Sequence, residues 1–278
     1  MNSRFDLSDL RPFMLGCMLA ASLAVAGCGG HSIQTTSGKA YLEKHNVASP
    51  APIRAESKSY RAVRFDEALR QVASIEPTLT FPARIGIVKI GTDGTPTPLY
   101  PEEVEAWSEM AAGLGSDYGT FLPINPLVYD QALSEAANTG LLVRTTGLEK
   151  IRLAAARQHL DAIIAYETSS QATRKANALA FGDLTIIGAF VLPSRKIESE
   201  GYAAGIILDP ISGYPYGQVE AAAVDSAHTT WVNKSEKKVD VQRNTEIGAS
   251  VALAEETGKA LQKLRLALAE QRSAAIEK

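Results

Sequence analysis

The residue whose surroundings most clearly indicate chemistry is Cys28, which follows the small residues Val25, Ala26 and Gly27. Upstream, Arg4 and Arg11 precede an apolar run over residues 12–27, an order typical of a secretory signal peptide. The run is shorter than the roughly 20 apolar residues that a transmembrane helix needs. Cleavage after Gly27 would place the Cys28 thiol at the start of the mature chain.

Residues 25–28 resemble the lipobox that the bacterial lipoprotein signal peptidase reads. The resemblance implies that Cys28 becomes a lipid-bearing thioether, and several acyl chains bury enough CH2 groups to anchor a protein stably. Gly29 and Gly30 stand where an aspartate would resemble an inner-membrane retention signal. We therefore expect an outer-membrane lipid anchor that faces the periplasm. The alternative is an ordinary cleaved signal peptide, or an uncleaved N-terminal anchor, with an incidental cysteine.

Other residues with catalytic potential lack a recognisable arrangement. Cys17 would leave with residues 1–27, and a lipid-bearing Cys28 could not act as a nucleophile. Asp225-Ser-Ala-His228, and His159 beside Asp161, could form a site only if the fold supplied partners. The sequence contains no nucleophile elbow, P-loop, dinucleotide fingerprint or metal-ligand spacing. We expect a non-enzymatic protein without cofactor or metal, and a hydrolase with a dispersed Ser/His/Asp site is a weaker alternative.

Composition narrows the class of partner. The 278 residues are 45% hydrophobic and 21% charged, which suits a chain with one sizeable core. The formal net charge is -3 and the aromatic fraction is 6%, so the chain offers no excess of basic charge and few stacking side chains. These values argue against a nucleic-acid partner.

An apolar segment over residues 184–192, ended by Pro193, is a second candidate contact site. Its length reaches that of a transmembrane β-strand, but its residues do not alternate between polar and apolar. Burial in the core is slightly favoured, and a loop that packs against lipid or a neighbouring subunit is the other interpretation. In that case, the contact residues are Leu184, Ile186, Ile187, Phe190, Val191 and Leu192.

These segments must be positioned by a folded domain. We expect a flexible tether over residues 28–60 and a single periplasmic domain over 61–278. Apolar β-branched residues predict strands at 84–90 and 161–167, the second apolar on both faces and hence central, with an edge strand at 120–124. Helices are predicted at 101–113, 130–138 and 148–159.

The C-terminal part predicts a hairpin followed by a long helix. Residues 201–209 and 214–224 would pair through a turn in which Pro210 fixes the entry and Gly213 supplies positive φ. The predicted helix covers residues 245–269, with a core-facing stripe of Ile247, Val251, Ala254, Gly258, Leu261, Leu264 and Leu268. The predicted fold class is α+β: a mixed β-sheet flanked by helices, with a long C-terminal helix, after a signal peptide and tether.

The runs at 152–166, 192–194 and 208–217 (LDPISGYPYG) resemble bacterial envelope lipoproteins of the rhombotarget type. The order of elements over residues 84–270 is similar to that of the curli-secretion lipoprotein and of the N-terminal domain of the Tol-system propeller protein. The C-terminal residues 273–278 lack the tail of a rhombotarget protein. Between Tyr166 and Gly201 we expect no pair of long strands of the kind that forms the curli channel.

The sequence therefore predicts a membrane-anchored envelope lipoprotein whose periplasmic domain binds other envelope components. The alternative is a subunit of an oligomeric outer-membrane secretion or export assembly. A homo-oligomer is compatible with both functions.

Overall fold

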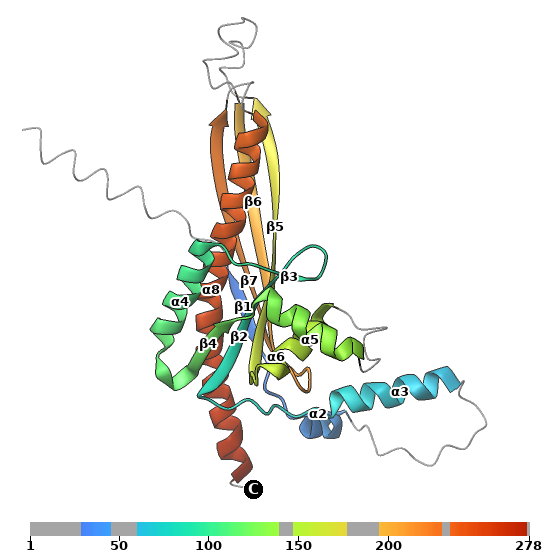
Figure 1. Cartoon of the computed structure of the whole chain (residues 1–278). Helices are drawn as coiled ribbons and strands as arrows, with labels where there is room; N and C mark the ends of the chain where they lie inside the picture. Colours follow the sequence, from blue (N-terminus) through green and yellow to red (C-terminus); the bar gives the residue numbers. More distant parts are fainter. Residues whose placement is uncertain (1–28, 46–59, 139–146, 177–194, 230–233, 277–278) are drawn as a thin grey trace, which may run out of the picture.

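The computed structural model describes residues 29–45, 60–138, 147–176, 195–229 and 234–276. A mixed, seven-stranded sheet has helices on both faces (Figure 1). Helices α4 (Pro101–Leu114) and α8 (Lys234–Ile276) pack on one face, and α5 (Pro126–Asn138) and α6 (Gly147–Arg157) pack on the other. The predicted α+β fold class is confirmed.

The sheet has the strand order β1-β7-β6-β5-β2-β3, and β4 also pairs with β2. Strand β2 is parallel to β4 and β5, whereas the other pairs are antiparallel. The strands are β1 (Gly30–Ile33), β2 (Ala83–Ile90), β3 (Pro96–Thr97), β4 (Gly119–Pro123), β5 (Ala162–Ala176), β6 (Arg195–Leu208) and β7 (Pro215–Thr229).

Strand β5 is central, as its apolar sequence predicts. It lies between β2 and β6. Ile164 faces the core beneath α4 and α8, while Ile163 and Ala165 face the core formed with α5 and α6. Both isoleucines are fully buried. Burial on both faces explains why this segment lacks a polar alternation.

Helix α8 is much longer than predicted, at 43 residues. Six of the seven residues in the predicted stripe are buried, but Val251 is 39% exposed. At this level of the helix, the side chains buried against the sheet are those of Ala249 and Leu253. Small residues on the facing strand allow a close approach, since a Cβ at Gly201 would overlap the carbonyl oxygen of Thr245.

Strands β5, β6 and β7 extend well beyond the rest of the sheet, with the first part of α8 along one face (Figure 1). We define the arm as residues 168–176, 195–203 and 221–229 with residues 234–250 of α8. Pairing between β5 and β6 runs from Ile163↔Leu208 to Ala176↔Arg195. The expectation that no pair of long strands lies between Tyr166 and Gly201 is therefore wrong. The strands of the arm carry polar residues on their solvent-facing side. They therefore lack the continuous apolar run by which the central strand was predicted.

The predicted tether over residues 28–60 contains regular structure in its first half, while residues 46–59 lie outside the described residues. Strand β1 pairs with β7 from Gly30↔Glu220 to Ile33↔Gly217, and α2 (Gly38–Lys44) follows. Helix α3 (Tyr60–Ala73) begins where the predicted tether ends. Strand β1 has Gly30, His31 and Ser32 before its one apolar residue and pairs through its backbone, so its composition gives no strand signal. The described domain thus begins two residues after Cys28, not near residue 61.

The turn between β6 and β7 matches its prediction. Gly213 has φ of 76°. The carboxylate of Asp209 accepts hydrogen bonds from the backbone N–H groups of Ile211 and Ser212, and from the Thr78 hydroxyl at 2.7 Å. Burial opposes the charge of Asp209, but these hydrogen bonds outweigh it and hold the pKa of this carboxyl below its usual value. The turn is therefore fixed to the segment that precedes β2.

We expect Ile164→Asp to unfold the domain. The carboxylate would be buried without a partner, at a cost of several kcal/mol against a total stability of about 5 to 15 kcal/mol. Circular dichroism and thermal melting measure the effect. Leu266→Asp on the exposed side of α8 is the control and should melt close to wild type. A normal melting curve for the Ile164 variant would contradict the central position of β5.

We expect Gly213→Val to destabilise the turn by at least about 1 to 2 kcal/mol, because a β-branched residue resists positive φ. Its Cβ would also lie 3.1 Å from the Arg152 guanidinium. Ser212→Ala removes local hydrogen bonds of the Ser212 hydroxyl, with the Tyr214 N–H and with Asp209, and should cost about 1 kcal/mol or less. Denaturant midpoints decide the order of the two variants, and the reverse order would refute the turn assignment.

Candidate functional site

The residues that the sequence singles out for function lie outside the described residues. These are Cys28 and the apolar contact set of Leu184, Ile186, Ile187, Phe190, Val191 and Leu192. The structure does describe their neighbours in the chain. Gly29 follows Cys28, while Ala176 and Arg195, on either side of residues 177–194, pair with each other at the far end of the arm. Both assignments stay predictions.

The chain next to Cys28 is held against the domain. Gly29 lies so close to α8 that a Cβ there would overlap the Glu256 side chain. His31 Nδ1 is 3.1 Å from Glu256 Oε2, and Lys259 Nζ donates to Glu256 Oε1 at 2.8 Å. The hydrogen bond from Lys259, together with that of His31, holds the pKa of Glu256 below its usual value. A side-chain network therefore joins the first strand to α8.

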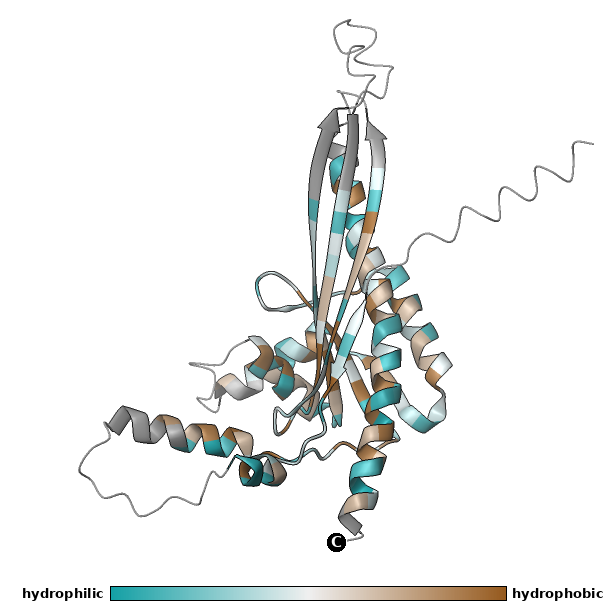
Figure 2. Ribbon diagram, turned by 180° about the vertical axis from the view of Figure 1, so that it is seen from behind, coloured by the Kyte–Doolittle hydropathy of each residue, from teal (hydrophilic) through white to brown (hydrophobic). Residues whose placement is uncertain are grey.

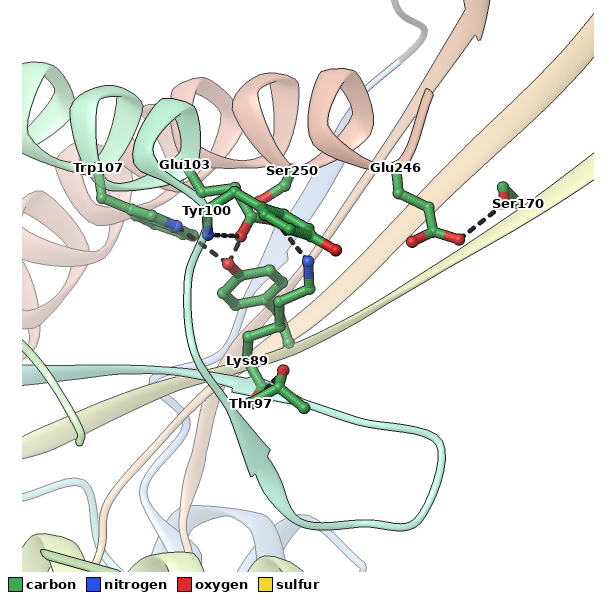
Figure 3. Close-up of polar contacts among 9 residues, drawn as sticks. Lys89, Thr97, Tyr100, Glu103, Trp107, Ser170, Glu246 and Ser250 are labelled. Atoms are coloured by element: carbon green, nitrogen blue, oxygen red, sulfur yellow. Dashed lines mark hydrogen bonds and ion pairs between the residues drawn. The ribbon is translucent and has the colours of Figure 1, made fainter. Parts of the chain in front are cut away.

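A second polar network is buried between α4 and the sheet (Figure 3). Lys89 Nζ on β2 lies 2.6 Å from Glu103 Oε1 on α4, and the Glu103 side chain is fully buried. Glu103 Oε2 accepts the N–H of Tyr100 at 2.8 Å, which caps the start of α4. The Tyr100 ring also contacts the Lys89 ammonium and the Arg243 guanidinium, at 4.8 and 5.0 Å from its centroid.

Tyr166 of β5 continues this network toward α8. Its hydroxyl accepts hydrogen bonds from Trp107 Nε1 at 3.4 Å and from the Ser250 hydroxyl at 3.3 Å. Burial and the nearby Glu103 carboxylate raise the pKa of Tyr166 far above its usual value. Burial therefore favours the neutral form of this phenol. Together the network joins β2, α4, β5 and α8, and its members are suited to positioning these elements.

The two other sequence candidates do not form a catalytic arrangement among the described side chains. Asp161 Oδ2 accepts the backbone N–H of Arg84 at 2.7 Å, which joins the starts of β5 and β2. Its neighbour His159 has φ of 55° just after α6. Asp225 Oδ1 accepts the N–H of Ser226 within its own strand. The side chain of His228 lies outside the described ones.

The described part of the chain has neither a cluster of metal ligands nor a membrane-spanning helix. No group of three or more His, Cys, Asp or Glu side chains there could hold a metal ion. None of the described helices is long and apolar enough to cross a membrane. The buried Lys89–Glu103 pair had no local signal in the sequence, because its partners lie on different elements. The acidic residues after Pro101 did indicate the start of α4.

We expect Lys89→Met to cost about 3 to 5 kcal/mol, because it leaves the buried Glu103 carboxylate without its cation. Lys259→Met is the matched control, since its exposed ion pairs should contribute about 1 kcal/mol or less. Adding Glu103→Gln to Lys89→Met should restore much of the loss. Urea unfolding gives all three values, and a Lys89 variant as stable as the Lys259 variant would show that the pair does not hold α4.

Comparisons with known proteins give a distant structural similarity to bacterial lipoproteins. No protein-family model matches the chain, and no curated protein matches it either. The PelC dodecamer from Paraburkholderia phytofirmans aligns over 63% of this chain and 92% of its own, at 7% identity and TM-score 0.26. Lipoprotein GNA1162 from Neisseria meningitidis aligns over 59% and 96%, at 15% identity and TM-score 0.27. A putative lipoprotein from Caulobacter crescentus CB15 aligns over 60% and 98%, at 11% identity and TM-score 0.23. Similarity at this level assigns the chain to no family.

Proposed function

We propose that this chain is a non-enzymatic lipoprotein of the bacterial envelope, anchored in the outer membrane through Cys28, whose periplasmic domain binds other envelope proteins. The observation that carries the proposal is the sequence Val25-Ala26-Gly27-Cys28 at the end of an apolar leader, directly ahead of the folded domain. Gly30 already belongs to the sheet. Leader, modified cysteine and domain therefore follow each other without a gap.

The short connection defines how the domain sits on the membrane. Two residues span at most about 7 Å, so a lipid on Cys28 would hold Gly30 within a short distance of the bilayer surface. Hydrogen bonds between β1 and β7 then fix the anchor to the sheet. The domain would rest against the membrane, and the arm and α3 would be available to partners.

Helix α3 supports the partner-binding part of the proposal. It lies away from the sheet, and Figure 2 shows apolar residues along it. Phe65, Leu69 and Val72 follow helical spacing and are 63%, 53% and 68% exposed. A contiguous exposed apolar stripe on a helix is typical of a surface that binds another protein. We infer that α3 contacts an envelope protein.

The absence of enzymatic activity is part of the proposal. Of the titratable side chains buried there, Lys89 pairs with Glu103, and Tyr166 accepts hydrogen bonds from Trp107 and Ser250, so all three are held in contacts between elements. A hydrolase with a dispersed site is the competing function. A broad screen of ester, peptide and glycoside substrates separates the two, because a hydrolase would turn over at least one class.

The second candidate function is a subunit of an oligomeric outer-membrane secretion or export assembly. The projecting arm favours it, because its three strands extend past the domain core and residues 177–194 connect two of them at the far end. In this function, residues 184–192 would contact membrane or a neighbouring subunit. Light scattering of the detergent-extracted protein distinguishes a monomer from such an assembly.

We expect Cys28→Ser to move the protein from the membrane to the soluble fraction, because the lipid is the proposed anchor. Metabolic labelling with palmitate should mark the wild type and not this variant. Cys17→Ser is the control, because that residue leaves with the signal peptide, and it should label like the wild type. Equal labelling of the Cys28 variant would end the lipoprotein proposal.

A further inference from the structure

The arm has two strand edges without a strand partner among the described residues. Strand β2 pairs with β5 only from Ala162 to Glu167. Residues 168–176 of β5 therefore have β6 on one side and no described strand on the other. On the opposite side, β1 pairs with β7 only from Gly217 to Glu220, which leaves residues 221–229 paired with β6 alone.

The backbone groups along the free β7 edge point outward. The Gln34 N–H donates to the Tyr216 carbonyl at 2.8 Å, and Ser32 and Gly30 stand opposite Gln218 and Glu220. Because hydrogen-bonding sides alternate along a strand, the even-numbered residues of β7 direct their N–H and C=O groups away from β6. This pattern continues past β1, so Ala222, Val224 and Ser226 direct backbone groups to a side where no other described strand pairs with them.

The two edges lack the proline and the bulges by which proteins often protect exposed edges. Such edges are ordinarily short, bulged, charged or interrupted by proline. Each free stretch has nine residues and no proline. The register shift between β6 and β7 is at Ile207 and Leu208, outside the arm. The sequence places Arg174 and Lys175 in the free stretch of β5 and Asp225 in that of β7, so charge is the one such device present.

The two edges match in strand direction and in the face of the sheet that α8 covers. Strands β5 and β7 are both antiparallel to β6, so they run the same way. On one face, α8 covers the arm, where the Ser170 hydroxyl donates to Glu246 Oε1 at 2.7 Å. Tyr202 lies on the opposite, solvent-facing side. Joining β7 of one copy to β5 of the next would continue the sheet with α8 on the same face of each copy. Gly29 lies against α8 rather than along the free part of β7, and so leaves that edge open.

We propose that the free edge of β7 in one copy of this chain pairs, in parallel, with the free edge of β5 in a second copy. Each copy uses its β7 edge to bind one neighbour and its β5 edge to bind another. The contact is therefore heterologous, and it extends to a ring or a filament. The equal length, direction and helix coverage of the two edges select a second copy as the occupant. This pairing rests on the oligomeric function proposed above. It depends on lipidation of Cys28 in one respect: the crosslinking test below needs a chain without another free thiol.

Disulfide crosslinking in intact membranes tests the pairing. Ser169→Cys on β5 is combined in turn with Ala222→Cys, Val224→Cys or Ser226→Cys on β7, all on the solvent-facing side. Within one chain, Ser169 and Ala222 lie opposite the same residue, Tyr202, on strands two spacings apart. Two spacings are about 9 to 10 Å, beyond the roughly 7 Å that a disulfide can bridge. Any crosslink between these positions therefore joins two copies.

We expect at least one double variant to give a ladder of dimers, trimers and larger multiples on a non-reducing gel, and single variants to stay monomeric. Reductant should collapse the ladder. Dimers from a single variant would show that like edges pair, and no ladder from any double variant would show that these edges do not meet. Crosslinks to another protein, identified by mass spectrometry, would show that this protein, and not a second copy, binds the edge. Each of these three results overturns the proposal.

A proline substitution gives a second, independent measurement. Val224→Pro removes an outward N–H without breaking a bond to β6, and edge strands accept proline at such positions. We expect the particle mass of the detergent-extracted protein to fall to that of a monomer, with a melting temperature close to that of Val224→Ala. An unchanged mass for the folded proline variant, or a monomeric wild type, would contradict edge pairing.

Discussion

The close packing of α8 on the sheet is the constraint on which the rest of the structure depends. With 43 residues, the helix is about 65 Å long, and it runs beside β5, β6 and β7 from the core into the arm. The facing strands carry glycine and alanine at Gly201, Ala203 and Ala221, and these small residues bring the helix axis close to the backbone. Without α8, three long strands would leave an apolar face in water.

The same helix connects the proposed membrane anchor to the proposed contact surface. Glu256 holds His31 and lies against Gly29, one residue from Cys28, while Glu246 contacts Ser170 in the arm. Ser250, between them, joins the buried network of Tyr166, Trp107 and Glu103. A rigid helix therefore relates the position of the lipid to that of the free strand edges, so assembly of several copies would place all their anchors on a common surface.

Sequence patterns predicted the parts of the fold in which burial is continuous. Residues 161–167 are apolar on both faces and form the central strand, and Pro210 and Gly213 mark the turn that the structure contains. Strand β1 and the outer part of β5 escaped prediction, because they are held by backbone pairing and by α8 rather than by apolar alternation. The Lys89–Glu103 pair escaped as well, since two charges 14 residues apart have no signal before the fold brings them together. Of the proposed functional residues, Cys28 and residues 184–192 remain sequence predictions, while the free edges came from strand register alone.

The distance between the domain and the bilayer tests the central claim most directly. Neutron reflectometry of the lipidated protein on a supported bilayer measures the thickness of any water layer between them. A domain that starts two residues after the lipid should lie against the surface, with a gap of less than about 10 Å. A flexible tether over residues 28–60 would instead hold it about 30 Å away. A hydrated gap of that larger size would contradict a lipid anchor fixed to the sheet through β1.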